Sequence, residues 1–139
     1  MFQISAGLQY ALRALINIAS SQQVQNIAVI SQQENISRKY LESIFTQLKK
    51  NRIVRSIRGP EGGYVLCKDA SEITLYQIFD AIEGSPVLVK CLDGQENCPM
   101  SDACAVRHFW NDYQEYIRKY LDEMTLQDLI NKYTKTGDI

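Results

Sequence analysis

The sequence predicts a mainly α-helical protein that carries one small β-hairpin. Over most of the 139 residues, apolar side chains recur at spacings of three and four, as in amphipathic helices. One stretch, 53–68, instead alternates apolar and polar residues around a turn, which is typical of a hairpin. The length and an apolar fraction of 45% indicate one domain, or one compact domain with an appended arm.

The first half contains a long helix and then two short ones. The apolar spacing predicts helices over about 6–20, 27–33 and 38–51, and Ser37 is a good N-cap for the third. The face of the third helix is formed by Tyr40, Leu41, Ile44, Phe45 and Leu48. Two short helices joined by a turn, the second with a basic start, have the outline of a helix-turn-helix.

The hairpin follows that pair of helices directly. Its strands are "IVRSI" (53–57) and "YVLCK" (64–68), and "RGPEGG" (58–63) has the composition of a tight turn. A hairpin in this place is a wing, so the predicted fold is a winged helix-turn-helix. Cys67, in the second strand, is expected to be a small core residue.

The second half predicts three more helices. The stretch 71–84 has Ser71 or Thr74 as a possible cap and ends at Gly84, a long helix spans about 102–121, and a short one covers about 125–133. The apolar face of the long helix consists of Val106, Phe109, Trp110, Tyr113, Ile117 and Leu121. We expect it to pair with a second copy in a homodimer, although packing within one chain is the alternative. The expected division is a DNA-binding part, 1–84, and a cysteine loop with dimerisation helix, 85–139.

Charge is distributed unevenly along a chain whose net charge is −1. Between residues 38 and 58 seven basic residues face one acid, Glu42: Arg38, Lys39, Lys49, Lys50, Arg52, Arg55 and Arg58. A basic face on an otherwise acidic protein suits a polyanion such as double-stranded DNA. No apolar run is long enough to span a bilayer, and the start lacks the apolar centre of a signal peptide. We expect a soluble, cytoplasmic protein.

Three of the four cysteines lie close to the single histidine. Cys91, Cys98, Cys104 and His108 form a C-x6-C-x5-C-x3-H pattern. In a reducing compartment such clusters are more often metal ligands or redox centres than disulfides. Three thiolates and an imidazole suit zinc or an iron–sulfur cluster, and the spacing does not decide between them.

The order of these elements resembles the winged-helix iron–sulfur regulator family that includes the IscR, NsrR and CymR types. The resemblance covers nearly the whole chain and is strongest in "YLESIFTQLKKNRIVRSIRGPEGGYVL" and in the cysteine loop. It is closest to the IscR type, which implies a [2Fe–2S] cluster on the three cysteines and His108; [4Fe–4S] and zinc are the alternatives. This loop is one residue longer than the IscR-type pattern between its first two cysteines, and Arg107 occupies the family's histidine position.

The expected function is transcription regulation, not catalysis, because the sequence lacks paired carboxylates and a phosphate-binding glycine loop. Cluster state would alter operator recognition, and the resemblance implies a repressor of cluster-biogenesis or related genes. The alternatives are a nitric-oxide or redox sensor of the same fold and a zinc-stabilised nucleic-acid-binding module. Ser37, Arg38, Lys39 and Tyr40 are expected at base edges, Glu42 is implied as a selectivity residue, and the wing residues are expected in the minor groove. The wing residues are Arg58, Gly59 and Pro60.

Overall fold

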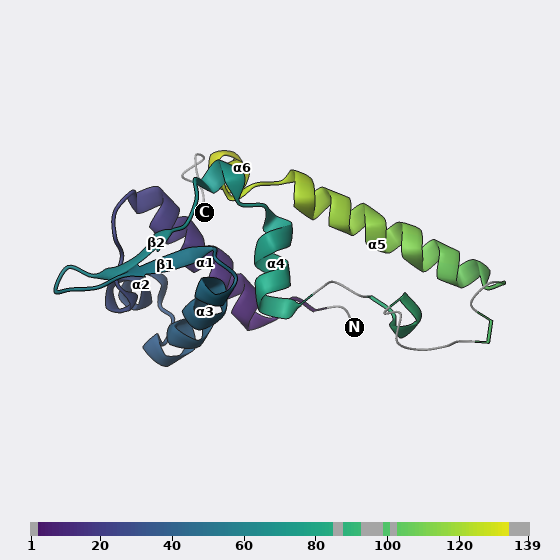
Figure 1. The fold of residues 1–139 in the computed structure, drawn as a ribbon, viewed down its shortest axis with the longest axis horizontal. Coiled ribbons are helices and arrows are strands. Elements are labelled where there is room, and N and C mark those ends of the chain that lie inside the picture. The colour runs from purple at the N-terminus through teal and green to yellow at the C-terminus, as the bar shows by residue number, and fades with distance from the viewer. Residues whose placement is uncertain (1–2, 85–87, 93–98, 101–102, 134–139) are drawn as a thin grey trace.

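A computed structural model of the chain describes residues 3–84, 88–92, 99–100 and 103–133 (Figure 1). Its long helices are α1 (Ala6–Ser21), α3 (Arg38–Lys50) and α5 (Ala105–Glu123), and its shorter ones are α2 (Ile27–Glu34), α4 (Leu75–Glu83) and α6 (Leu126–Tyr133). The hairpin consists of β1 (Val54–Ile57) and β2 (Gly63–Leu66), and two 3₁₀ turns are η1 (Ala70–Glu72) and η2 (Lys90–Leu92). The mainly α fold with a small hairpin is as predicted.

Two of the predicted N-cap residues cap helices in the structure. Ser37 caps α3, and its Oγ accepts a hydrogen bond from the N–H of Tyr40 (3.2 Å). Thr74, rather than Ser71, caps α4, and it forms a capping box with Gln77. Ser71 lies in η1, where it donates from its N–H and its hydroxyl to Asp69, and these bonds lower the pKa of that carboxyl.

The core lies between α1, α3, α4 and the base of the hairpin. Its largest fully buried side chain is Phe45 of α3, which stacks on Tyr64 of β2 at 4.5 Å between ring centroids. The predicted α3 face is confirmed for Leu41, Ile44, Phe45 and Leu48, all of which are buried. Tyr40, in contrast, is 42% exposed.

The hairpin has a third, very short neighbour that the sequence did not predict. Val54 to Ile57 pair antiparallel with Gly63 to Leu66. On the other edge of β2, Gln25 exchanges two backbone hydrogen bonds with Tyr64, at 3.1 and 2.8 Å. The loop between α1 and α2 is thereby tied to the base of the wing.

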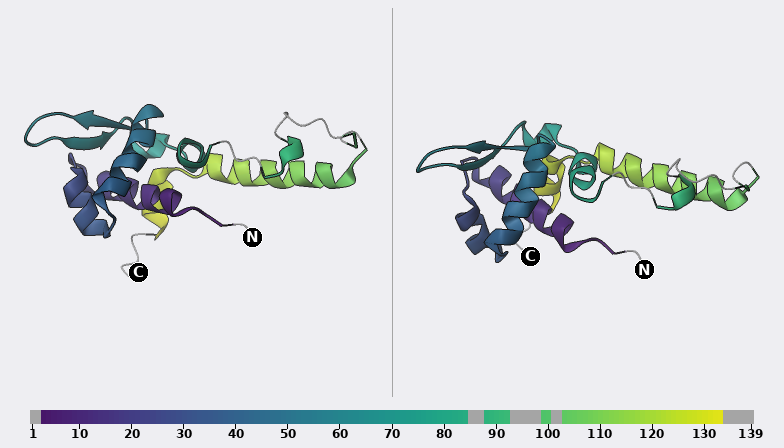
Figure 2. Two further views of the ribbon diagram at one scale, coloured as in Figure 1. Left: turned by 90° about the horizontal axis from the view of Figure 1, so that it is seen from below. Right: turned by 60° about the horizontal axis from the view of Figure 1, so that its bottom comes forward.

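Helix α5 extends away from this body in every view (Figures 1 and 2). It begins at Ala105, after the N-cap position Cys104, and only Leu121 of its nineteen residues is buried. Asp102, where the sequence predicted the start, lies outside the described residues. None of the helices formed by the described residues is long and apolar enough to cross a membrane.

Helix α6 returns to the body and closes the core. Leu126 is fully buried, and its N–H donates to Ile73 O at 2.8 Å, while Leu75 N–H donates to Met124 O at 2.8 Å. These two bonds form an antiparallel bridge around Thr74 and Thr125.

The prediction that Cys67 is a core residue was wrong. Cys67 follows the last residue of β2 and is exposed. Its N–H donates to Ile53 O at 2.9 Å, so the backbone continues the pairing although the side chain faces solvent. The alternation of a two-stranded sheet fixes only which residues share a face, not which face is covered.

We predict that Gly63→Ala destabilises the protein by about 1–3 kcal/mol. A Cβ on Gly63 would lie 2.4 Å from Gln25 O and 2.6 Å from Gln25 C, so the bridge to the α1–α2 loop must shift. The free energy of unfolding from urea denaturation measures this. Gly7→Ala in α1 is the control, because its Cβ would meet ordinary contacts at 3.4 Å or more, and alanine favours a helix. Equal stability of Gly63→Ala and wild type would contradict the close approach of the Gln25 backbone to Gly63.

Candidate nucleic-acid interface and metal centre

The N-terminus of α3 is the exposed end of the helix-turn-helix. Asn35 ends α2 in the left-handed conformation (φ 55°), and Ile36 anchors the turn by its burial. Ser31 Oγ donates to Ile36 O at 2.5 Å and fixes the same turn. The predicted contact residues Ser37, Arg38, Lys39, Tyr40 and Glu42 are all exposed here. The buried face of α3 therefore leaves its first turn free to enter a groove.

The ring of Tyr40 packs against a residue of α1 and does not project freely into solvent. Its ring meets the Tyr10 ring of α1 edge-on, with centroids 5.3 Å apart and planes at 83°. The guanidinium of Arg13 lies over the Tyr10 ring, 5.8 Å from its centroid. Tyr40 thus has a fixed direction at the surface, as a positioned contact residue needs.

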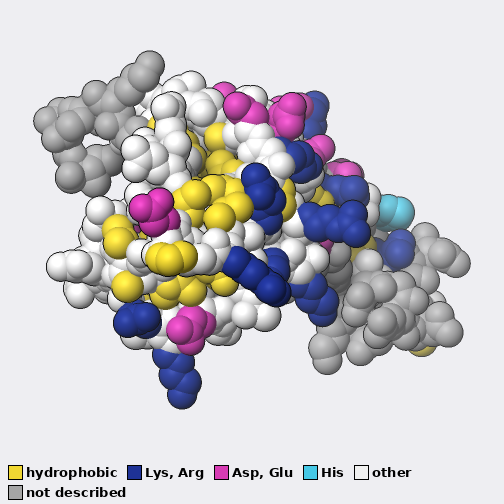
Figure 3. Space-filling model, turned by 60° about the vertical axis from the view of Figure 1, so that its left-hand side comes forward, with side chains coloured by type: hydrophobic (Ala, Val, Ile, Leu, Met, Phe, Trp, Pro, Cys, Tyr) yellow, Lys and Arg dark blue, Asp and Glu magenta, His cyan; other side chains and the backbone are white. Residues whose placement is uncertain are grey.

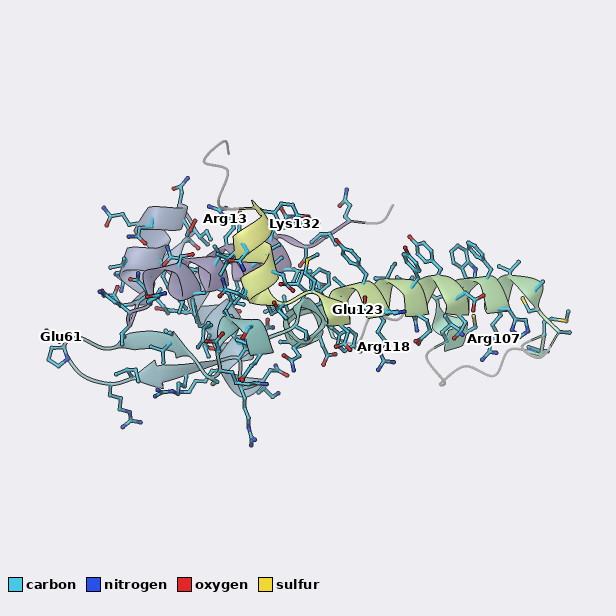
Figure 4. All side chains as sticks on the ribbon, turned by 90° about the horizontal axis from the view of Figure 1, so that it is seen from above. Arg13, Glu61, Arg107, Arg118, Glu123 and Lys132 are labelled. Carbon is cyan, nitrogen blue, oxygen red and sulfur yellow. The ribbon has the colours of Figure 1, made fainter. Side chains whose placement is uncertain are left out.

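The wing tip is a second exposed element. Pairing of β1 with β2 ends at Ile57 and Gly63, and Gly62 N–H closes the turn on Gly59 O at 2.9 Å. Arg58, Gly59 and Pro60 are exposed, and Figure 4 shows their neighbour Glu61 at the end of the hairpin. The tip can approach a ligand that α3 also touches, because both belong to one packed body.

The basic residues of the 38–58 segment are available for anions. All seven are exposed, and the ion pairs within the described residues join other side chains, namely Arg13–Glu34, Arg118–Glu115 and Lys119–Glu123. Figure 3 shows Lys and Arg side chains gathered across the middle of one face. Unpaired surface cations suit phosphate contacts, which give affinity without sequence information.

Two of the predicted metal ligands lie on elements that touch. Cys91 lies in η2 and Cys104 stands at the N-cap position of α5; both are free thiols and half-buried. η2 packs against α5, and Leu88 N–H donates to Gln114 Oε1 of α5 at 3.0 Å. Cys98 lies outside the described residues. Within the rest, no three Cys, His, Asp or Glu side chains are gathered in a metal-binding group.

Arg107 and His108 differ in environment although they are neighbours. His108 is exposed on α5, whereas Arg107 is half-buried. The Nε of Arg107 is buried and has no hydrogen-bond partner among the described residues. Figure 4 shows Arg107 on the side of α5 along which η2 lies. The sequence showed Arg107 only as the residue at the family's histidine position, and its partial burial was not predicted.

The apolar residues of α5 fall on two faces, not one. Leu121 is buried and Ile117 packs against the core. A second stripe is exposed, with spacings of three and four: Val106, Phe109, Tyr113, Tyr116 and Tyr120. Tyr116, which the sequence analysis did not include, is 77% exposed. An apolar stripe of this regularity resembles one side of a helix pair.

The donor chemistry fits an iron–sulfur cluster. Half-buried thiols on two packed elements are soft ligands. Arg107 follows Cys104 by three residues, and its buried Nε is a hydrogen-bond donor without a partner among the described residues. Such donors commonly accompany cluster sulfurs.

Relatives of this chain are transcription regulators. The IscR regulator of Serratia proteamaculans (strain 568) is 39% identical over 125 residues, which cover 88% of this chain and 76% of that protein. The IscR regulator of Yersinia enterocolitica is 38% identical over the same shares. Among solved structures, CymR, the global cysteine regulator of B. subtilis, superposes with a TM-score of 0.77 at 32% identity, covering 95% of this chain and 98% of that one.

The T. potens IscR structure shares the fold, with a TM-score of 0.78 at 21% identity, and covers 99% of this chain and 92% of that one. The Rrf2 family model, described as iron-dependent transcriptional regulator, matches residues 4–132. The match agrees with the predicted winged helix-turn-helix fold. The relatives named above are transcription regulators and not enzymes, as predicted. This chain therefore belongs to the Rrf2 family of transcriptional regulators.

Proposed function

We propose that this protein is an iron–sulfur-cluster-responsive regulator that binds double-stranded DNA as a homodimer and represses cluster-biogenesis or related genes. Residues 1–84 make the DNA contacts, and residues 85–139 hold the cluster and the dimer helix. Cys91, Cys98 and Cys104 are its ligands, with His108 as the candidate fourth. A [2Fe–2S] cluster is proposed because the named relatives are of the IscR type.

One observation carries the proposal: Cys91 lies in η2, which packs along α5, and Cys104 stands at the end of α5 that is far from the DNA-binding body. When bound, the cluster supplies a redox-active, oxidation-sensitive group to this loop. The protein's part is to couple the loop to α3. Helix α5 is a stiff connection, and the link that follows it, Met124 to Leu126, is hydrogen-bonded to Leu75 and Ile73 at the start of α4. Helix α4 in turn packs against α3.

The recognition helix and the wing act together in the proposed complex. The first turn of α3 lies in the major groove, as in other helix-turn-helix proteins, and Arg58 reaches the adjacent minor groove, whose narrow A·T segments attract arginine. Lys49, Lys50, Arg52 and Arg55 contact phosphates. Glu42, exposed beside this turn, disfavours sites that would leave its carboxylate unpaired.

We predict that Arg58→Ala weakens specific operator binding by about 1–3 kcal/mol. The change removes the cation at the wing tip. Fluorescence anisotropy at fixed salt, with an operator selected from random DNA, measures it. Glu61→Ala in the same turn is the matched control and should bind equally or more tightly, because it removes a negative charge. Unchanged affinity of Arg58→Ala would exclude the wing from the interface.

We predict that Cys91→Ser, Cys98→Ser and Cys104→Ser each lose most of the iron and sulfide bound after anaerobic reconstitution. Serine removes the soft thiolate that the cluster requires. Cys67→Ser is the control, because Cys67 is exposed beyond β2. His108→Ala tests the fourth ligand through its visible spectrum and the rate of cluster loss.

The same assay separates the alternatives. One zinc per chain without sulfide would favour the zinc-stabilised module and refute the cluster. Four irons and four sulfides would favour [4Fe–4S]. Loss of DNA binding on exposure to nitric oxide, with no change on mild oxidation, would identify the nitric-oxide sensor of the same fold.

We predict that Tyr116→Lys weakens the homodimer by about 2 kcal/mol or more, about thirtyfold in Kd. It places a charge in the exposed stripe, and each two-fold interface contains the change twice. Sedimentation equilibrium measures the dissociation. Asn111→Lys adds the same charge at an exposed position off the stripe and should leave the dimer intact. A wild type that sediments as a monomer would refute the dimer.

A further inference from the structure

The guanidinium of Arg107 has no hydrogen-bond or ion-pair partner among the described residues. Its Nε is buried without a hydrogen-bond acceptor there, and the ion pairs of that part do not include it. The other arginine of α5, Arg118, is by contrast 3.8 Å from Glu115 Oε1 and lies over the Tyr76 ring at 5.4 Å. An unpaired buried donor destabilises a protein, so Arg107 needs a partner that is not among these residues.

The position of Arg107 indicates where that partner lies. It follows Cys104 by three residues, so the two share one side of the helix, about one turn apart. On that side η2 packs against α5 and contributes Cys91. Arg107 therefore lies on the side of α5 on which η2, the element of Cys91, packs, one turn from Cys104.

We propose that Arg107 is a positioning residue for the cluster: its guanidinium donates hydrogen bonds to the bound group and raises its reduction potential. This inference rests on the proposed function. Reduction adds one electron and one negative charge without breaking a bond. Arginine stays protonated, so its attraction stabilises the reduced state more than the oxidised state. Net charge and hydrogen bonds to sulfur are among the factors that set cluster potentials.

The test compares four reconstituted full-length proteins: wild type, Arg107→Gln, Arg107→Lys and Arg118→Gln. Iron and sulfide per chain are assayed first, and midpoint potentials are then measured by dithionite titration with redox dyes, followed by visible absorbance. Arg118→Gln is the matched control. It removes the same charge from the same helix about 16 Å further along the axis, which is about two Debye lengths at physiological salt.

We expect Arg107→Gln to bind as much iron and sulfide as wild type but to have a more negative midpoint. A tenfold fall in the ratio of reduced to oxidised cluster at a fixed poise corresponds to 59 mV for one electron. Arg107→Lys should stay closer to wild type because it keeps the charge, and Arg118→Gln should not shift.

Three results would overturn the inference: an Arg107→Gln midpoint equal to wild type, an equal shift in Arg118→Gln, or an Arg107→Lys shift as large as that of Arg107→Gln. Wild type without iron and sulfide would instead refute the proposed function itself. A variant Arg107→Gln that binds no iron, although its apo form unfolds in urea like apo wild type, would also contradict the inference, because Arg107 would then be needed for cluster binding itself. If the variant is unfolded, the Arg107→Lys midpoint decides: a value near that of wild type supports the inference, and a clearly more negative value contradicts it.

Discussion

Two backbone hydrogen bonds join the projecting helix to the rest of the molecule. Leu75 donates to Met124 O and Leu126 donates to Ile73 O, each at 2.8 Å, so the link between α5 and α6 is paired with the start of α4. Leu121 and Leu126, on either side of Met124 in the chain, are buried. Breaking the two bonds would leave backbone polar groups unpaired. The direction of α5, and with it the separation of the cysteine elements from α3, depends on this bridge.

Different parts of the molecule carry different kinds of exposed and half-buried groups. The body presents unpaired cations on α3, on the hairpin and in the turn between them, which suits a polyanion. Helix α5 and the η2 turn packed along it carry two half-buried thiols, Cys91 and Cys104, and the guanidinium of Arg107, which has no partner among the described residues, and these groups suit a soft, negatively charged group. Between them, the exposed aromatic stripe of α5 suits a second copy. In the proposed regulator, one stiff helix therefore contacts the sensor group, the partner and the DNA-binding body.

Local signals predicted the elements well because they act over a few residues. Ser37 and Thr74 cap helices through their own hydroxyls, and the turn at 58–63 lies between short alternating strands. Long-range contacts were harder to predict. The Gln25–Tyr64 bridge joins segments with no shared pattern, and Cys67 is exposed although it lies in the alternating stretch of the hairpin.

The sequence by itself determined the helix periods, the caps, the winged helix-turn-helix order and the four candidate ligands, since spacing and residue type carry that information. Tertiary structure decided which side of α5 is covered. Residues 107 and 108 differ by about 100° around the helix, and Arg107 is half-buried whereas His108 is exposed. Which side of a helix is covered depends on how the chain packs around it, and no local pattern encodes that packing.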